Sequence, residues 1–419
     1  MRKNITAASA LLAAGLLATA ACSGAGGPGG GGGKITDDKV VLAVLTDESG
    51  VYADLAGKGS VAAAKLAVAD FKKKYGDKAV SKNITVIDAD HQSKPDIANS
   101  KAQELYDRRK ADVILDVPTS SAALAVASQA KAKKKVFIDT GAATTALTGK
   151  SCNKYTFGWA YDTYMLANGT GKQVTEAGAK TWYIVYPNYA FGQDMNKSFT
   201  AAVTKSGGQI VRSDPAPFPN DNFSTFLLKA PTLNPKPNVI GAMQAGGDLV
   251  NLVKQYNEFK LRDKGIGLAV GLMFLTDIRS IGVESLAGTK FTDAWYWDFD
   301  DQNRKFADEF KAQTGKRPSF DHAAVYSAAF QYLEAVQAAK TDNSDKVVAG
   351  LEGKKIDDVF SRNGTVLKGN HRLIHDAYLV EVKQKSEVVK DEDFEKVVKT
   401  IPADQAFQSV EQSGCSMTG

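Results

Sequence analysis

Apolar runs alternate with helix-spaced apolar positions from about residue 39 to residue 149. Residues 40–45 contain no polar side chain, which is typical of a strand covered on both faces. Four apolar positions then recur at helical spacing: Val61, Ala64, Val68 and Phe71. The same pattern predicts strands at 84–89, 113–117 and from 136, with helices from 95 and from 118 to about 134. Such alternation predicts a parallel sheet.

A second set of alternating elements predicts another α/β lobe of similar size. Its expected elements are helices at 162–178, 191–206 and 247–261 and strands at 182–186, 209–213, 238–243 and 266–274. A strand at 291–299 and two helices, the second over 321–340, are expected to add to the first lobe. Asn363-Gly364 and the run 377–382 predict an antiparallel tail.

The N-terminal residues predict export. A basic start, an apolar segment at 11–18 and a small-residue exit at 19–22 form a secretory signal, which we place at residues 1–21. Cys22 after Ala20-Ala21 resembles the bacterial lipobox, although Thr19 stands where leucine is usual. The alternative is a plain cut after Ala21. The glycine-rich stretch that follows favours a lipid-anchored tether over residues 22–36.

Cysteine count and charge narrow the function classes. If Cys22 carries a lipid, only Cys152 and Cys415 remain, and export permits them to pair; two separately buried thiols are the alternative. The net charge of +5 includes Arg2 and Lys3, and 5 − 2 leaves +3 for the exported chain. Acids and bases are interspersed, so the sequence shows no nucleic-acid signature.

Residues 49–52 form the loop after the first predicted strand. In open α/β sheets such loops border the crevice in which ligands bind. Gly50 alone would equally suit an ordinary turn.

Four segments together carry a family resemblance: 49–52, 118–121, 141–144 and 189–192, in this order and spacing. With them the chain resembles the solute-binding proteins of branched-chain amino-acid-type ABC transporters. The resemblance implies a two-lobed periplasmic binding protein of type 1, with three hinge crossovers and no catalysis. We expect the first lobe at 37–157 and 288–343, and the second at 158–287 and 344–419.

The resemblance also implies that the first lobe holds the ligand carboxylate. Thr119, Ser120 and Ser121 place hydroxyls and backbone N–H groups at a predicted helix N-terminus, which favours an anion; helix capping is the alternative. Ala142 and Thr144 would orient a polar group of the ligand, and Tyr52 would cover its body.

The second lobe departs from the family pattern. Gln244 to Gly247 replace an expected aromatic residue, and Thr276 stands near the position of the glutamate that binds an ammonium group. Asp277 beside it would either neutralise an ammonium group or cap a helix. Aromatic residues near the lobe entry are candidates for the cleft wall: Tyr161, Tyr189 and Phe191.

Other chemistry finds little support. His371 and His375 lie four residues apart, but because they fall in a predicted hairpin with no cysteine or glutamate in ligand spacing, we interpret them as solvated strand residues rather than a metal site. His91 and His322 show no partners in the sequence. Hydrolase motifs and a phosphate loop are absent, and we expect no cofactor.

The sequence therefore predicts an extracytoplasmic solute-binding lipoprotein, held by lipid at the outer face of the cell membrane. It would capture an amino acid or related small organic carboxylate and deliver it to an ABC permease. Alternatives are a receptor feeding a membrane signalling partner and, more weakly, a secreted hydrolase.

Overall fold

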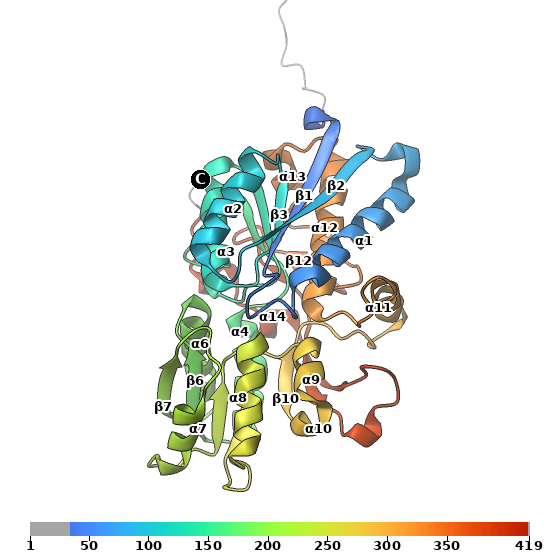
Figure 1. Ribbon diagram of the computed structural model, residues 1–419. Helices are drawn as coiled ribbons and strands as arrows, with labels where there is room; N and C mark the ends of the chain where they lie inside the picture. The colour runs from blue at the N-terminus through green and yellow to red at the C-terminus, as the bar shows by residue number, and fades with distance from the viewer. Residues whose placement is uncertain (1–33, 418–419) are drawn as a thin grey trace, which may run out of the picture. The chain divides into compact units, whose positions relative to one another are not determined.

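The computed structural model describes residues 34–417 and consists of two α/β lobes (Figure 1). The signal at 1–21, Cys22 and most of the tether lie outside the described residues. Within 34–417, every helix is too short or too polar to span a bilayer.

The first lobe is built on a five-stranded parallel sheet in the order β2-β1-β3-β4-β5. Its strands are β1 (Lys39–Thr46), β2 (Asn83–Asp90), β3 (Val113–Asp116), β4 (Val136–Asp139) and β5 (Thr156–Gly158). Its flanking helices are α1 (Gly57–Tyr75), α2 (Pro95–Asp107), α3 (Ser120–Lys133), α11 (Asp301–Thr314), α12 (Phe320–Ala339) and α13 (Ser344–Leu351). The alternating pattern of the sequence thus gives the predicted parallel sheet, with β5 as an unpredicted fifth strand.

Strand β1 shows why this sheet needs helices on both faces. Its side chains alternate between two cores: Val40, Leu42 and Val44 pack with α1 and α12, whereas Val41, Ala43 and Leu45 pack with α2 and α3. All six side chains are buried, so the central position of β1 in the sheet requires a strand without polar residues.

The second lobe contains a four-stranded parallel sheet in the order β7-β6-β8-β9. Its strands are β6 (Thr181–Pro187), β7 (Gln209–Ala216), β8 (Val239–Ala242) and β9 (Gly267–Val270). The helical segments around it are α4 (Thr163–Leu166), η4 (Ala167–Gly171), α5 (Lys172–Glu176), α6 (Ala190–Lys205), α7 (Ser224–Lys229), α8 (Gly246–Glu258), α9 (Leu275–Ile281) and α10 (Val283–Leu286). The helix predicted over 162–178 is therefore a run of three segments with a π-helical middle.

Two antiparallel sheets complete the fold. One contains β10 (Lys290–Asp293), β14 (Ala377–Val382) and β15 (Glu395–Ile401), and the other contains β11 (Lys355–Ile356), β12 (Gly364–Val366) and β13 (Leu373–Ile374). The antiparallel tail agrees with the sequence prediction. The strand predicted over 291–299 is shorter, and it pairs with β14 and packs Phe291 beside Ile278 and Leu286 of the second lobe, not the first.

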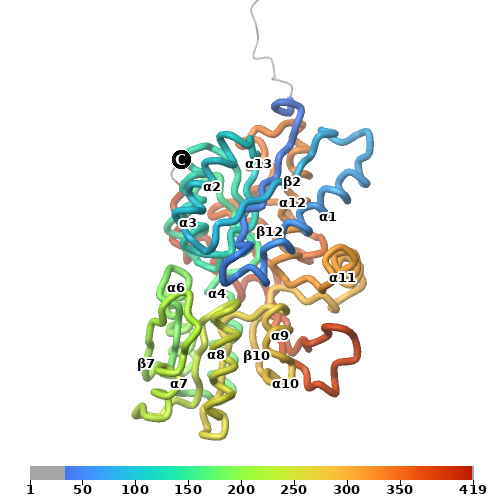
Figure 2. Tube along the Cα trace, in the orientation of Figure 1, coloured from blue at the N-terminus to red at the C-terminus, as the bar shows by residue number. Residues whose placement is uncertain are grey.

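The chain crosses between the lobes near residue 160, between β10 and α11, and between β13 and β14; Figure 2 follows it from one lobe to the other by colour. The first and third crossovers are joined. Gly158 N–H donates to His371 O (3.1 Å), and Arg372 Nη1 donates to Tyr161 O (3.1 Å). The lobe boundaries that we expected at residues 157, 287 and 343 stay predictions. From the order of the elements we propose that the second crossover lies at 294–300 and the third at 375–376.

A disulfide bond joins Cys152 to Cys415, with their Cα atoms 5.8 Å apart. It is the pairing that the cysteine count allowed. It fastens the tail, with α14 (Ala403–Ala406) and α15 (Val410–Ser413), to the first lobe. On the way Phe407 packs against His375 at the third crossover, with ring centres 5.1 Å apart.

We expect a Cys152→Ser/Cys415→Ser variant to loosen this tail. Cys415 lies near the chain end, so most of the stabilisation of about 2–4 kcal/mol that a disulfide gives will be lost locally. Hydrogen exchange of residues 403–413 should accelerate at least tenfold, while β1 and β6 exchange as before. Equal acceleration in the two central strands would contradict a local role.

Candidate functional site

Asp47, directly after β1, organises the loop that we identified as a possible site wall. Its carboxylate accepts the Gly50 N–H (2.7 Å), the Tyr52 N–H (3.1 Å) and the Ser93 hydroxyl. A Cβ atom at Gly50 would lie 2.5 Å from this carboxylate, so the turn requires glycine. The loop holds the Tyr52 side chain in place, 3% exposed. Sequence reasoning missed Asp47, although an Asp that starts a turn is a recognisable signal.

A small cavity lies between the lobes. The residues that line it are Tyr52, Leu55, Pro118, Gly141, Ala143, Tyr161, Tyr189, Phe191, Ala245, Leu272 and Phe274. Five of these side chains are aromatic. The space left between them is about 10 Å³, which is room for one water molecule at most. The lobes are therefore closed on each other, and a larger solute needs them to part.

Two hydrogen bonds bring the lobes together around this cavity. The hydroxyls of Tyr52 and Tyr189 are 2.5 Å apart, and Gly247 N–H donates to Val51 O (3.1 Å). Gly246 has a φ of +56° and its Cβ position would meet Val51 O at 2.6 Å. The glycine pair that replaces the expected aromatic residue thus lets the Val51–Tyr52 backbone approach. Burial raises the pKa of both tyrosines, so both phenols stay protonated.

Asp194 on α6 forms a further contact between the lobes. Its carboxylate accepts the Thr145 N–H (2.7 Å), the Thr145 hydroxyl (2.9 Å) and the Thr144 hydroxyl (3.3 Å). Within its own lobe it accepts the Thr163 hydroxyl (2.9 Å). Thr144 also caps the short helix η3 (Thr145–Thr148). Thr144, predicted to orient the ligand, is therefore engaged in the lobe contact and does not line the cavity.

The N-terminus of α3 lies next to the cavity. Pro118 lines the cavity, and Ser120 follows it by two residues. No side chain caps this helix, so the capping alternative is not what the structure shows. Ser120 is not among the residues that line the cavity; it is 1% exposed, and its hydroxyl has no hydrogen-bond partner among the described residues. Ser121 is half-buried. A helix N-terminus with a free buried hydroxyl is what we expect of an anion site. That Ser120 and Ser121 bind a ligand there stays a prediction.

The loop after β4 contributes backbone to the cavity. Asp139 accepts the Ala142 N–H (3.1 Å), and Tyr161 donates its hydroxyl to Gly141 O (2.7 Å). Gly141 and Ala143 line the cavity, whereas Ala142 is buried beside it. The neighbours of the predicted residue 142, rather than residue 142 itself, therefore form the wall.

Asp277 does not reach the cavity lining. It accepts the backbone N–H of Phe274, the residue that precedes α9 (2.9 Å), so the helix-capping alternative describes its position. Nearer the cavity, the Gln244 amide is fully buried with neither its oxygen nor its nitrogen hydrogen-bonded within the described residues. Gln244 precedes Ala245, which lines the cavity.

Burial raises the pKa of Asp277 to about 7, which gives a testable pH dependence. A carboxyl whose pKa is higher in the folded protein stabilises it fully below about pH 4 and loses that contribution as pH rises through 7. We expect Asp277→Asn, which keeps an acceptor for Phe274 N–H, to flatten the fall in unfolding free energy between pH 4.5 and 7 by about 1 kcal/mol per pH unit. Urea unfolding measures this, with exposed Asp404→Asn as control. An unchanged slope would contradict it.

A group of buried carboxyls lies behind the cavity. Asp116 ends β3, Asp139 ends β4 and Asp321 starts α12, and all three are buried. A Cβ atom at Gly141 would meet Asp116 Oδ1 at 2.6 Å. Burial raises the pKa of Asp116 to about 7. Sequence reasoning missed this group, although two apolar strands that each end in Asp were a visible signal. Within residues 34–417, no three or more His, Cys, Asp or Glu side chains are arranged so that they could hold a metal ion together.

The prediction that His371 and His375 are solvated was wrong. His371 and His375 are buried, not solvated. His371 stacks on Phe157 with ring centres 4.2 Å apart and pairs with Glu352 (2.8 Å). His375 Nε2 lies 2.6 Å from Ala160 O. His91 and His322, which lacked partners in the sequence, accept the backbone N–H groups of Ser93 and Ser319. All four histidines therefore have a packing role. The sequence did not reveal it, because short-range patterns do not show contacts between distant segments.

Comparisons with known proteins agree with this architecture. A family model described as periplasmic binding protein matches residues 39–387. The chain is 25% identical over 325 residues to the Leu/Ile/Val-binding protein homolog 6 of Brucella melitensis, covering 75% of this chain and 80% of the relative.

Two crystal structures are more similar. A periplasmic binding protein from Burkholderia mallei shares 42% identity with a TM-score of 0.87, covering 91% of this chain and 100% of that one. A branched chain amino acid ABC transporter periplasmic ligand-binding protein from Burkholderia xenovorans shares 38% identity with a TM-score of 0.79, covering 90% and 100%.

Proposed function

Because the chain belongs to the periplasmic binding protein family, we propose that its lobes capture an amino acid or related small organic carboxylate and deliver it to an ABC permease. It is a solute-binding protein of the ABC-transporter type. The relatives named for leucine, isoleucine and valine support a ligand with a carboxylate and an apolar body.

Ser120 carries the proposal. A buried hydroxyl without a partner costs about 1–3 kcal/mol, so a ligand that hydrogen-bonds to it is favoured. Its place at the N-terminus of a helix of 14 residues adds backbone N–H groups and the positive end of the helix dipole. The aromatic lining beside it suits an apolar or aromatic body.

The cavity lining also indicates which polar group the ligand carries besides its carboxylate. Its lining contains no Asp or Glu, and Asp277 is engaged in capping. A desolvated ammonium group needs a paired carboxylate, whereas a keto or hydroxyl group needs only a hydrogen bond. The site therefore favours carboxylates without an ammonium group over the corresponding amino acids.

Calorimetric titration of matched pairs tests this function: leucine against its 2-oxo acid, and phenylalanine against phenylpyruvate. At least one carboxylate should bind, and the 2-oxo acid should bind more tightly than the amino acid. Ser120→Ala should weaken the binding at least tenfold. The control is Ser128→Ala, exposed on the same helix. Undiminished binding by Ser120→Ala would reject the anion site, and tighter binding of the amino acids would reverse the preference.

We place the protein at the outer face of the cell membrane, held by lipid on Cys22. The lipobox-like residues before Cys22 and the glycine-rich stretch after it support this. Mass spectrometry of the mature N-terminal peptide should find a diacylglycerol mass on Cys22. An unmodified N-terminus would leave the solute-binding proposal intact and remove the anchor. Recovery of the bound solute chemically unchanged would support a non-catalytic role.

A further inference from the structure

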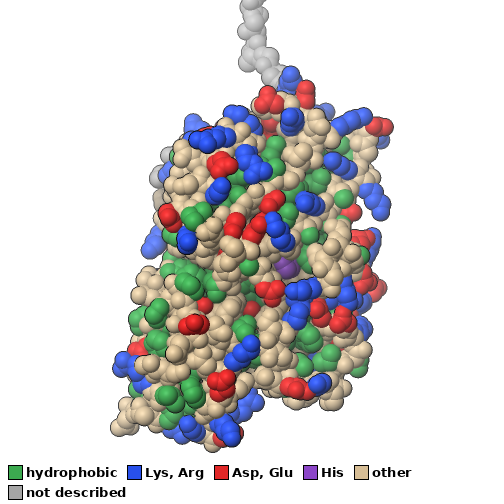
Figure 3. Space-filling model, in the orientation of Figure 1, with side chains coloured by type: hydrophobic (Ala, Val, Ile, Leu, Met, Phe, Trp, Pro, Cys, Tyr) green, Lys and Arg blue, Asp and Glu red, His purple; other side chains and the backbone are tan. Residues whose placement is uncertain are grey.

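Basic side chains gather at the edge of the first lobe where its strands begin. The parallel register places the starts of β1, β2, β3 and β4 at one edge, and the helices between them end there. The basic residues of this edge are Lys39, Lys72, Lys73, Lys74, Lys78, Lys82, Arg108, Arg109, Lys110, Lys131, Lys133, Lys134 and Lys135. Figure 3 shows Lys and Arg side chains spread over this end of the molecule. We call it the basic edge.

Most acids of the basic edge are already paired. Asp77 pairs with Lys82, Asp107 with Lys133 and Asp112 with Lys135. Nine exposed bases form no ion pair within the described residues: Lys39, Lys72, Lys73, Lys78, Arg108, Arg109, Lys110, Lys131 and Lys134. The acids of this edge without an ion pair among the described residues include Asp37, Asp38 and the buried Asp342, which accepts hydrogen bonds from Thr36. The basic edge therefore carries a clear excess of positive charge.

Helix stabilisation explains only part of this excess. Lysines in the last turn of a helix stabilise it, because their positive charge lies near the negative end of the helix dipole. This explains why Lys73 and Lys131 stand where they do. Lys39 lies at the start of a strand, and Lys110 lies beyond the end of α2, whose last turn contains no basic residue. Helix stabilisation does not account for these two residues.

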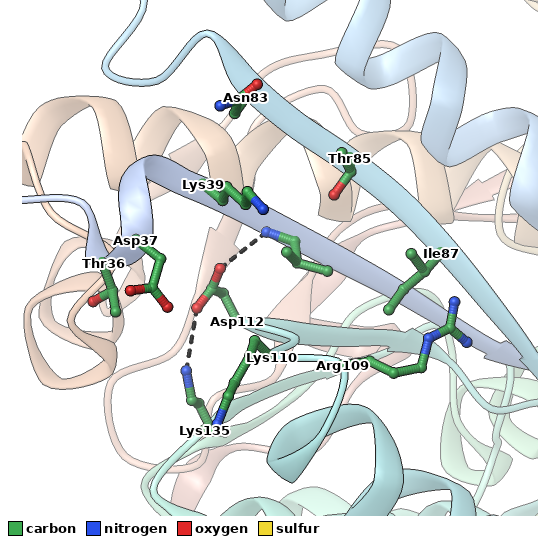
Figure 4. Close-up of a pocket in the computed structure, with 11 residues that line it drawn as sticks. Thr36, Asp37, Lys39, Asn83, Thr85, Ile87, Arg109, Lys110, Asp112 and Lys135 are labelled. Carbon is green, nitrogen blue, oxygen red and sulfur yellow. Dashed lines mark hydrogen bonds and ion pairs between the residues drawn. The ribbon is translucent and has the colours of Figure 1, made fainter.

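The two side chains border a pocket of about 560 Å³ on the same edge (Figure 4). Lys39 comes from β1, Arg109 and Lys110 from the segment before β3, and Lys135 from the segment before β4. The pocket's Asp112 accepts the Val41 N–H (2.9 Å) and pairs with Lys135 (3.1 Å). The ammonium groups of Lys39 and Lys110 are therefore available to an anion.

The chain enters the folded body at this edge, because η1 (Thr36–Asp38) leads directly into β1. Residues 23–33 span at most about 40 Å when fully extended. An anchor at Cys22 would hold the basic edge within that distance of the membrane, at high effective concentration. Each basic residue near an anionic lipid surface strengthens binding roughly fivefold.

We propose that the basic edge rests on an anionic membrane surface, with the pocket around Lys39 and Lys110 receiving a lipid head-group phosphate. The proposal rests on the lipid anchor of the proposed function. The interlobe cavity lies at the opposite ends of the same strands, so the basic edge and the solute site are separate surfaces.

The test uses the mature lipoprotein reconstituted into vesicles of phosphatidylcholine alone or with 30% phosphatidylglycerol. Lysines are acetylated briefly and quantified by mass spectrometry. With anionic vesicles at low salt, Lys110, Lys131 and Lys134 should be labelled several-fold less than with neutral vesicles, and high salt should remove the difference. Lys254, Lys260 and Lys264, exposed at the far end of the second lobe, are the internal control.

A Lys110→Glu/Lys131→Glu/Lys134→Glu variant should lose the protection of Lys39 and Lys73, while Lys254→Glu/Lys260→Glu/Lys264→Glu should keep it. Equal labelling in both vesicle types, or protection of the second-lobe lysines instead, would overturn the proposal. Failure to float with neutral vesicles would reject the anchor, and titration of solute in detergent reports the binding function separately.

Discussion

Asp194→Ala should weaken solute binding by about 10- to 100-fold, because it removes the one charged acceptor that three donors of the other lobe share, and we expect a net loss of about 1.5–3 kcal/mol for the group as a whole. The acceptor faces the Thr145 N–H, the Thr145 hydroxyl and the Thr144 hydroxyl of the other lobe. A solute trapped between closed lobes binds in proportion to the population of the closed form. The loss should therefore appear mainly as faster release.

Small-angle scattering and stopped-flow binding measure this effect. Without added solute, the variant should have a larger radius of gyration than the wild type, and saturating solute should bring the two together. The matched control is Gln193→Ala, exposed on the same helix. Thr163→Val tests the bond inside the second lobe and should leave the release rate nearly unchanged. Weaker binding in Asp194→Ala without a change in compactness would contradict a role in closure.

The hydrogen bonds that hold the lobes closed could not be predicted from the sequence. Parallel sheets follow from local pattern, because a strand buried on both faces has to be apolar throughout, as residues 40–45 are. The contact of Asp194 with Thr145 joins residues 49 positions apart that lie in different lobes. No local periodicity encodes such a pair, and a half-buried Asp on a helix looks like an ordinary surface residue.

The cavity wall was partly predictable for the same reason. Loops at strand ends share one edge of a sheet, which placed Tyr52 at the cleft. The clustering of aromatic residues near the lobe entry added Tyr161 and Tyr189, and the family resemblance added Phe191; all four line the cavity. Asp277 fell outside because a carboxylate three residues into a helix satisfies the helix N-terminus first. Asp47 and Asp139 were missed because their role is to hold backbone N–H groups in place, one step behind the residues that face the cavity.

The hinge gives a second prediction with a large effect. Arg372→Met should lower the free energy of unfolding by about 3–5 kcal/mol, because removing one partner of a buried ion pair leaves the other charge uncompensated. Arg372 is 2% exposed. Its Nη1 donates to Tyr161 O at 3.1 Å and its Nε lies 3.5 Å from Asp162 Oδ2. Its positive charge also opposes the effect of burial, which raises the pKa of Asp139 and of Asp162.

The pH dependence separates lost charge from lost packing. Without the arginine, the pKa values of both carboxyls rise further in the folded protein. Their neutral forms are stable at low pH, and the deficit grows as pH rises above the unfolded value near 4. Urea unfolding should therefore find a larger loss at pH 7.5 than at pH 5. Asp162→Asn combined with Arg372→Met should recover part of the loss at pH 7.5. A deficit of the same size at both pH values would mean that Arg372 holds the crossovers by packing against Gly158, where a Cβ would lie 2.7 Å from its Cζ atom, and not by charge.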